Sequence, residues 1–237
     1  MSERFFIPDP PVAGRVVLVG DEARHLVRVL RARVGDDAVV FAGQGSEWPA
    51  RIVRLGRDEV ELETGSERRD QATPASRLTL AVALPKGERQ KWLVEKLTEL
   101  GVARLVPLET ERGVAEATAA ARERLRRGVI EACKQCGRNT LMEIAEPRSV
   151  VEALAERPPA TPAIIAHPGG GPLDPAVVAG GGRHMLALVG PEGGFTDAEV
   201  QSAERAGAVK TSLGPHILRI ETAAIALAAR LTASGSA

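Results

Sequence analysis

The spacing of hydrophobic and polar positions differs between the first 70 residues and the rest of the chain. In the first part, short apolar or alternating runs lie between turns that contain glycine, a pattern typical of strands. These runs are Arg15–Val19, Asp37–Ala42, Trp48–Leu55 and Glu59–Thr64. Asp21 is expected to be the N-cap of a short helix that ends at Leu30. The first part is therefore predicted to be a small β-rich module.

A polar segment follows this module. Residues 65–76 (GSERRDQATPAS) are charged and contain Pro74, as expected of a connection between domains. We place an N-terminal domain at residues 1–70, a linker at 71–76 and a second domain at 77–237.

In the second domain, apolar strand-like runs alternate with amphipathic helical segments. The predicted strands are 77–84, 103–108, 143–145, 163–166, 184–189 and 209–213. The predicted helices are 88–100, 117–135, 149–155, 197–206 and 221–231. This alternation predicts an α/β fold with a mostly parallel sheet, whose ligands bind beyond the carboxyl ends of the strands.

Charge and cysteine content narrow the function classes only slightly. The 31 basic and 31 acidic residues cancel, so net charge gives no support for a nucleic-acid partner. No signal-peptide pattern opens the sequence, and no apolar run approaches the ~20 residues of a membrane helix. We expect a cytoplasmic protein. Cys133 and Cys136 are expected to be buried packing residues and no metal is expected, while Trp92 and Trp48 are expected to pack in their domains.

Two loops of the second domain contain candidate binding chemistry. In LALVGPEGGFTDAE (residues 186–199), a strand leads into a glycine-rich turn, and Thr196 with Glu199 forms a capping box for the next helix. Free N–H groups at such a place suit a phosphate or nucleotide, although neither the Rossmann spacing nor the Walker lysine is present. In SLGPHILRIETAA (residues 212–224), a second strand leads through Gly214 and Pro215 to another helix start.

Together these segments resemble the C-terminal signatures of the ribosomal RNA small subunit methyltransferase E family. The family's RFF, its basic helix, its KG…ELGV segment and its QSGR motif have counterparts in order along the chain. The counterparts are RFF at 4–6, HLVRVLR at 25–31, LPKGERQKWLVEKLTELGV at 84–102 and QCGRN at 135–139. The chain departs from the family pattern at three positions. Gly113 stands where the family usually has serine, Lys134 where it often has an acidic residue, and His216 where it often has arginine.

The resemblance implies a SPOUT α/β domain with a deep C-terminal trefoil knot, preceded by a PUA-like β-barrel that binds RNA. It implies a homodimer that methylates N3 of a uridine in 16S rRNA of the 30S subunit. S-adenosylmethionine (AdoMet) would be the methyl donor and S-adenosylhomocysteine the product. The cofactor residues implied are His167, Leu188, Val189, Gly190, Pro191, Glu192, Gly193, Gly194, Leu213, Gly214, Ile217, Leu218, Arg219, Glu221, Thr222 and Ala223.

The chemistry of the reaction suggests further roles. Loss of the N3 proton leaves a uracil anion, which a guanidinium would stabilise. Arg138 and Arg219 are the candidates for this role, and Glu192 and Glu221 are considered as the base. The residues expected to contact RNA are Arg4, Arg24, His25, Arg28, Arg31 and Lys86.

Three alternatives stay open at this stage. A different knotted RNA methyltransferase, such as a ribose 2′-O enzyme, would share the glycine loops. A nicotinamide-dependent oxidoreductase would need a glycine fingerprint after the first strand of the second domain, where PKGERQ stands instead. A non-enzymatic RNA-binding protein would use the β-rich module alone.

Overall fold

The computed structural model describes residues 3–69, 77–175 and 184–232. The chain divides into two compact units. The first unit contains the described residues up to 69 together with Cys133–Leu141, and the second contains the remainder. The predicted linker, 71–76, lies outside the described residues.

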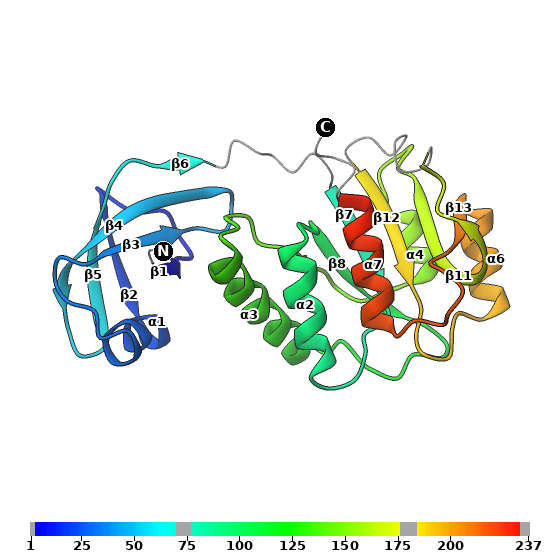
Figure 1. The fold of residues 1–237 in the computed structure, drawn as a ribbon, viewed down its shortest axis with the longest axis horizontal. Coiled ribbons are helices and arrows are strands. Elements are labelled where there is room, and N and C mark those ends of the chain that lie inside the picture. Colours follow the sequence, from blue (N-terminus) through cyan, green and yellow to red (C-terminus); the bar gives the residue numbers. More distant parts are fainter. Residues whose placement is uncertain (1–2, 70–76, 176–183, 233–237) are drawn as a thin grey trace. The chain divides into compact units, whose positions relative to one another are not determined.

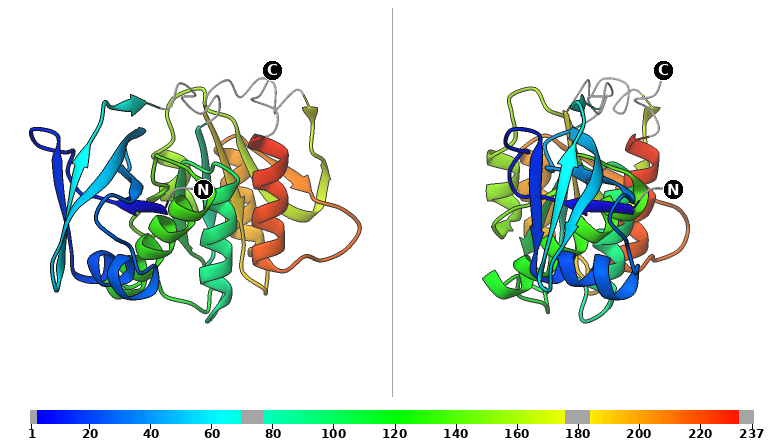
Figure 2. Two further views of the ribbon diagram at one scale, coloured as in Figure 1. Left: turned by 60° about the vertical axis from the view of Figure 1, so that its left-hand side comes forward. Right: turned by 90° about the vertical axis from the view of Figure 1, so that its left-hand side faces the viewer.

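The first unit is built on a curled sheet (Figure 2). Its strand order is β1-β3-β4-β5-β2, with β6 paired to β4; β1 and β3 are parallel and the other pairs antiparallel. The strands are β1 (Glu3–Phe6), β2 (Arg15–Val19), β3 (Asp37–Phe41), β4 (Ser46–Leu55), β5 (Glu59–Thr64) and β6 (Arg68–Arg69). Alternate residues point inward and bury Phe5, Val40 and Trp48, as predicted for Trp48.

The short helix of this unit begins earlier than predicted. Helix α1 (Gly20–Arg24) is followed by one π-helical turn, η1 (His25–Val29), in which the Leu30 N–H donates to the His25 carbonyl. Val19 is the N-cap, so the assignment of Asp21 was wrong. The Asp21 carboxylate instead accepts a hydrogen bond from Arg24 (2.5 Å) within the first turn.

Cys133–Leu141 belongs to the first unit through polar side chains. Asn139 is buried and donates to Glu47 (3.2 Å), which also pairs with Arg4 (2.8 Å). Lys134, one of the departures from the family pattern, forms an ion pair with Glu22 (2.9 Å). Cys133 is buried as expected, and burial raises the pKa of its thiol to about 12. Cys136 is exposed, so that expectation was wrong.

The second unit contains a parallel sheet of order β10-β8-β7-β12-β11-β13, with β9 paired to β8. The strands are β7 (Arg77–Val82), β8 (Arg104–Glu109), β9 (Glu143–Ile144), β10 (Arg148–Ser149), β11 (Ala163–Pro172), β12 (His184–Val189) and β13 (Ala208–Ser212). The helices are α2 (Arg89–Glu99), α3 (Ala119–Cys136), α4 (Val150–Ala155), α6 (Asp197–Arg205) and α7 (Ile220–Thr232). The α/β class and the parallel sheet were predicted from the alternation.

Helices cover both faces of this sheet, α2 and α7 on one and α4 and α6 on the other (Figure 1). The central strands β7 and β12 are almost wholly apolar and buried, as strands covered on both faces require. Trp92 is 46% exposed, so the expectation that it packs in the core was wrong. The buried face of α2 is formed by Leu93, Val94 and Leu97 instead.

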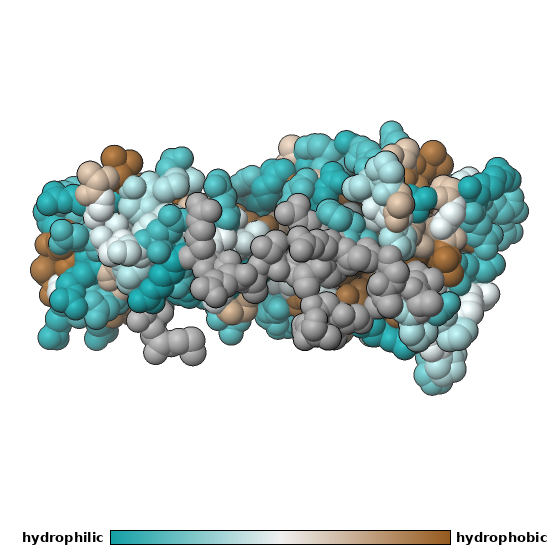
Figure 3. All heavy atoms as spheres, turned by 90° about the horizontal axis from the view of Figure 1, so that it is seen from above, coloured by the Kyte–Doolittle hydropathy of each residue, from teal (hydrophilic) through white to brown (hydrophobic). Residues whose placement is uncertain are grey.

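The face drawn in Figure 3 is largely hydrophilic where its residues are coloured, with hydrophobic residues in small patches among polar ones. Among the described helices, none has the length and apolar character needed to span a bilayer.

Candidate active site

A cavity of about 430 Å³ lies at the carboxyl ends of the parallel strands in the second unit. One wall is formed by residues 189–195, which follow β12, and another by the segment from Ser212 to Leu218, which follows β13. Ala166, His167 and Pro168 of β11 complete it. Two loops distant in sequence therefore meet because their strands end at the same edge of the sheet.

The conformation of the glycine loop after β12 is fixed by Phe195 and by the residues that cap α6. A Cβ on Gly190 would come within 2.9 Å of the Phe195 ring, and Gly194 has φ +69°, a conformation that favours glycine. Thr196 and Glu199 form the predicted capping box, in which the Thr196 N–H donates to Glu199 Oε2 (2.8 Å). The turn therefore leaves its backbone facing the cavity.

The segment after β13 turns at Gly214, which has φ +140°. The Gly214 N–H donates to the Ser212 hydroxyl (3.4 Å), and this hydroxyl donates to the Gly214 carbonyl (3.1 Å). Ile217 is 87% exposed although it lines the cavity. Helix α7 starts at Ile220, one residue before the predicted start.

Arg112, in the loop after β8, contacts the glycine loop. Its Nη1 donates to the Gly193 carbonyl (2.9 Å), and a Cβ on Gly193 would lie 3.4 Å from the Arg112 side chain. The Glu111 N–H donates to Glu199 Oε1 (3.0 Å), so the capping carboxylate also fixes the backbone next to Arg112. Arg112 is a lining residue of the cavity.

Arg89, the first residue of α2, connects the two loops. It forms ion pairs with Glu192 of the glycine loop (3.1 Å) and with Glu221 in the first turn of α7 (3.6 Å). The Glu221 side chain is 6% exposed, and its Oε2 accepts no hydrogen bond from any residue that the structure describes. The Arg89 charge therefore offsets the cost of burying this carboxylate.

His167 lies where β11 bends past β13. The Gly169 N–H donates to His167 Nδ1 (3.0 Å), which places the proton of the neutral ring on Nε2. A Cβ on Gly170 would come within 2.6 Å of the Thr211 backbone, so glycine permits the close approach of the two strands.

Most of the residues predicted to bind cofactor lie around this one cavity. Those that line it are His167, Val189, Gly190, Pro191, Glu192, Gly193, Gly194, Leu213, Gly214, Ile217, Leu218 and Ala223. Leu188 is buried in β12, and Arg219, Glu221 and Thr222 are not lining residues. The lining residues that were not among the predicted cofactor residues are Arg112, Ala166, Pro168, Phe195, Asp197, Ser212, His216 and Ile220. Several of them neighbour predicted residues, and Arg112 precedes Gly113, one of the departures from the family pattern.

The other predicted residues lie elsewhere. Arg138 is in Cys133–Leu141, which belongs to the first unit, and Arg219 is exposed just before α7. The basic residues Arg24, His25, Arg28 and Arg31 are exposed along α1, η1 and the following turn, and Lys86 is exposed after β7. Arg4 is half-buried, paired with Glu47 and stacked over the Phe41 ring at 5.2 Å. Those contacts are typical of a structural arginine.

The sequence also matches known proteins over most of its length. Residues 72–232 match the RNA methyltransferase domain family, and residues 18–64 match the RNA methyltransferase PUA domain family. The ribosomal RNA small subunit methyltransferase E of Synechocystis sp. is 34% identical, over 95% of this chain and 75% of the relative. The Bacillus subtilis protein of the same name is 30% identical, over 87% of this chain and 85% of the relative.

A solved structure is similar in fold and sequence. The ribosomal RNA small subunit methyltransferase E of Neisseria gonorrhoeae, bound to S-adenosyl methionine, superimposes with a TM-score of 0.90 at 31% identity. The alignment covers 99% of this chain and 98% of that one. With the PUA-type match before the α/β domain and the glycine loops around one cavity, the chain belongs to the ribosomal RNA small subunit methyltransferase E family.

Proposed function

We propose that the protein methylates N3 of a uridine in 16S rRNA of the 30S subunit, with AdoMet as methyl donor. The observation that carries this proposal is the meeting of the two signature segments in the walls of a single cavity. Its volume, about 430 Å³, is within the range of small-ligand sites, roughly 300–1,000 Å³. Relatives named as ribosomal RNA small subunit methyltransferases, one of them bound to S-adenosyl methionine, support the methylation of 16S rRNA.

The chemistry of the lining residues fits an adenosine that carries a methionine. The backbone of Gly190–Gly194 and Leu213–Gly214 offers amides and carbonyls to the adenine edge, and Leu213, Ile217 and Leu218 offer apolar surface to the ring. No lysine lines the described cavity, as suits a ligand without phosphates. Bound AdoMet would supply a methyl group already activated by its sulfonium.

The protein must then position a uridine and promote loss of its N3 proton. Holding reactants in line can lower the barrier by roughly 7–11 kcal/mol. Arg138 and Arg219 remain proposed as cations that favour the uracil anion. Of the two proposed bases, Glu192 faces the cavity but is paired with Arg89, and Glu221 is buried beside the same arginine.

The remaining proposals concern the whole protein. Residues 1–70 would form the RNA-binding domain, with the exposed Arg24, His25, Arg28 and Arg31 on RNA, and residues 77–237 the catalytic domain. We propose that the curled sheet is a PUA-like barrel and that the C-terminal segment forms a trefoil knot. We also propose a homodimer that acts in the cytoplasm.

Methyl transfer to 30S subunits from a strain that lacks the enzyme tests the function. With labelled AdoMet, nucleoside mass analysis should find one N3-methyluridine in 16S rRNA. A 2′-O-methyl nucleoside would identify a ribose methyltransferase instead. Binding of RNA without methyl transfer would favour the non-enzymatic alternative, and calorimetric binding of NAD in place of S-adenosylhomocysteine would favour the oxidoreductase.

A further inference from the structure

The cavity has one positively charged side chain of fixed charge in its wall. Among its lining residues, all within the described part of the chain, Arg112 is the single arginine or lysine. Arg219, which the sequence suggested, precedes α7 without lining the cavity. Glu192 is paired with Arg89, which itself is not a lining residue. For an anion that forms inside this cavity, Arg112 is therefore the one fixed cation in the described wall.

Two hydrogen bonds fix the position of this side chain. The backbone beside it is bound through the Glu111 N–H to Glu199, and its Nη1 is bound to the Gly193 carbonyl. A guanidinium has five N–H donors in one plane, and in Arg112 the Nη1 group donates to the Gly193 carbonyl at 2.9 Å. The charge is thus preorganised at the edge of the glycine loop, with other donors available to a ligand.

We infer that Arg112 is the catalytic guanidinium that stabilises the uracil anion during methyl transfer, an inference that rests on the proposed function. Arg112 is an exposed residue in the wall of the cavity, so a substrate base that enters from solvent can reach its guanidinium. The charge on uracil O2 and O4 develops only on the way to the transition state, where a fixed cation contributes most.

The step balances without another reactant. The N3 proton of the uridine passes to the general base, for which Glu192 and Glu221 are the proposed residues, and the negative charge left on N3, O2 and O4 is stabilised by Arg112. The N3 lone pair then attacks the methyl carbon, so that an N–C bond forms while the C–S bond breaks. The electron pair of that bond stays on sulfur, which becomes the neutral thioether of S-adenosylhomocysteine.

Arg112→Met tests the inference with the intact protein and 30S subunits from a strain without the enzyme. Removing one donor to a developing anion typically lowers kcat by roughly 100- to 1000-fold, and we expect a loss of this size. The rate of the variant should also rise only at higher pH than that of the wild type, because the bound uracil loses its proton less readily. Arg112→Lys, which keeps the charge without the planar fork, should recover part of kcat.

Two binding measurements separate this role from others. Calorimetry should give S-adenosylhomocysteine affinities for wild type and Arg112→Met that agree within about threefold, and filter binding should give similar 30S affinities. The matched control is Arg205→Met, because Arg205 is an exposed arginine of α6 outside the cavity. This substitution should leave kcat, the affinity for S-adenosylhomocysteine and the affinity for 30S subunits unchanged.

An unchanged kcat, or a loss of cofactor affinity as large as the loss of rate, would overturn the inference; the latter would assign Arg112 to the cofactor's carboxylate. If wild type itself forms no N3-methyluridine, the proposed function fails first, so the two failures are distinguishable.

Discussion

At the residue scale, three glycines of one loop, Gly190, Gly193 and Gly194, are required for different physical reasons. Gly190 leaves room for the Phe195 ring, and Gly194 allows a left-handed backbone. Gly193 has no such conformation, and a side chain there would meet Arg112 instead. Substitutions in one motif should therefore fail in different ways.

Gly190→Ala is expected to destabilise the protein by roughly 1–3 kcal/mol, because the added methyl overlaps the Phe195 ring. The displaced ring should also weaken binding of S-adenosylhomocysteine. Chemical denaturation and calorimetry measure the two effects. Gly171→Ala is the control, since a Cβ at Gly171 meets nothing within 4 Å; equal losses in both variants would contradict the explanation.

Glu47 should make the stability of the first unit depend on acid. Burial alone would raise the pKa of Glu47, but hydrogen bonds from Arg4 and Asn139 outweigh it and hold the pKa below the ordinary 4.5. A depressed pKa contributes stability above about pH 4.5 that is lost as the pH falls further. Glu47→Gln should flatten this acid dependence in urea unfolding at pH 3–7; a variant with the same slope as wild type would refute the assignment.

The residues of the site were predictable from sequence where they are contiguous with a motif. Gly190–Gly194 and Leu213–Leu218 stand in two short segments, and the resemblance of these segments to the family's signatures identified them as candidate cofactor residues. Arg89 and Arg112 lie in segments that were compared with the family's motifs, but their contacts with the glycine loop depend on the strand order and on the start of α2. The prediction that Trp92 is buried was wrong because it rested on the apolar character of tryptophan and not on the face of α2 that the residue occupies.

At the scale of elements, two capping boxes of the same chemistry differ in their neighbours. Ser149 and Glu152 cap α4, whereas Thr196 and Glu199 cap α6 beside the cavity. Thr196→Ala and Ser149→Ala should each cost about 1 kcal/mol of folding free energy. Thr196→Ala should in addition weaken S-adenosylhomocysteine binding, because its loop lines the cavity. A similar affinity loss for Ser149→Ala would argue against this coupling.

Arg89 links α2, the glycine loop and α7 through its charge. Arg89→Met should cost roughly 1–3 kcal/mol, less than the 3–5 kcal/mol typical of breaking a buried pair, since Arg89 is 38% exposed. Arg89→Met combined with Glu221→Gln should recover much of this loss, because no buried charge is then left unpaired. Urea unfolding of wild type, Arg89→Met and the double variant measures these free energies of unfolding. A double variant no more stable than Arg89→Met would contradict the account.

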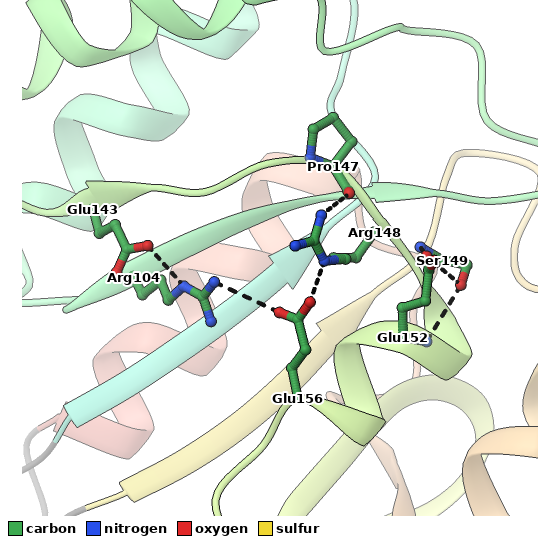
Figure 4. A network of polar contacts seen from close by, with 7 residues as sticks. All are labelled: Arg104, Glu143, Pro147, Arg148, Ser149, Glu152 and Glu156. Atoms are coloured by element: carbon green, nitrogen blue, oxygen red, sulfur yellow. Dashed lines mark hydrogen bonds and ion pairs between the residues drawn. The ribbon is translucent and has the colours of Figure 1, made fainter.

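Other charged contacts between elements should matter less. Arg104 bridges Glu143 of β9 (3.1 Å) and Glu156 after α4 (3.7 Å), and Arg148 joins the same Glu156 (Figure 4). These side chains are about one-third to two-thirds exposed, and exposed ion pairs typically contribute ~0–1 kcal/mol each. The network orders the connection between β9, β10 and α4 more than it stabilises the fold.

Element boundaries followed from sequence when an unambiguous stop signal was present. Gly101 and Gly207, both with positive φ, end α2 and α6 close to the predicted positions. The strands β6, β9 and β10 have two residues each, too few to show a hydrophobic pattern in the sequence. Strand β11 extends beyond its predicted end to Pro172 through a bulge, because its glycine-rich second half has no apolar alternation that would predict a strand.

At the scale of the whole molecule, periodicity gave the class of each part but not the path of the chain. The alternation of elements predicted a parallel sheet, yet its order depends on which crossovers pack best. The inclusion of Cys133–Leu141 in the first unit follows from long-range pairs such as Asn139–Glu47, separated by 92 residues. The proposed knot likewise came from family resemblance.

The claim on which the whole account depends is that residues 189–194 and 213–223 together enclose the cofactor. A crystal structure of the protein grown with S-adenosylhomocysteine tests it most directly. We predict ligand density between the glycine loop and the Leu213–Ala223 segment, in contact with Leu213, Leu218 and the backbone of Gly190. Density at another place on the protein, or a ligand-free cavity in crystals saturated with the compound, would contradict the account.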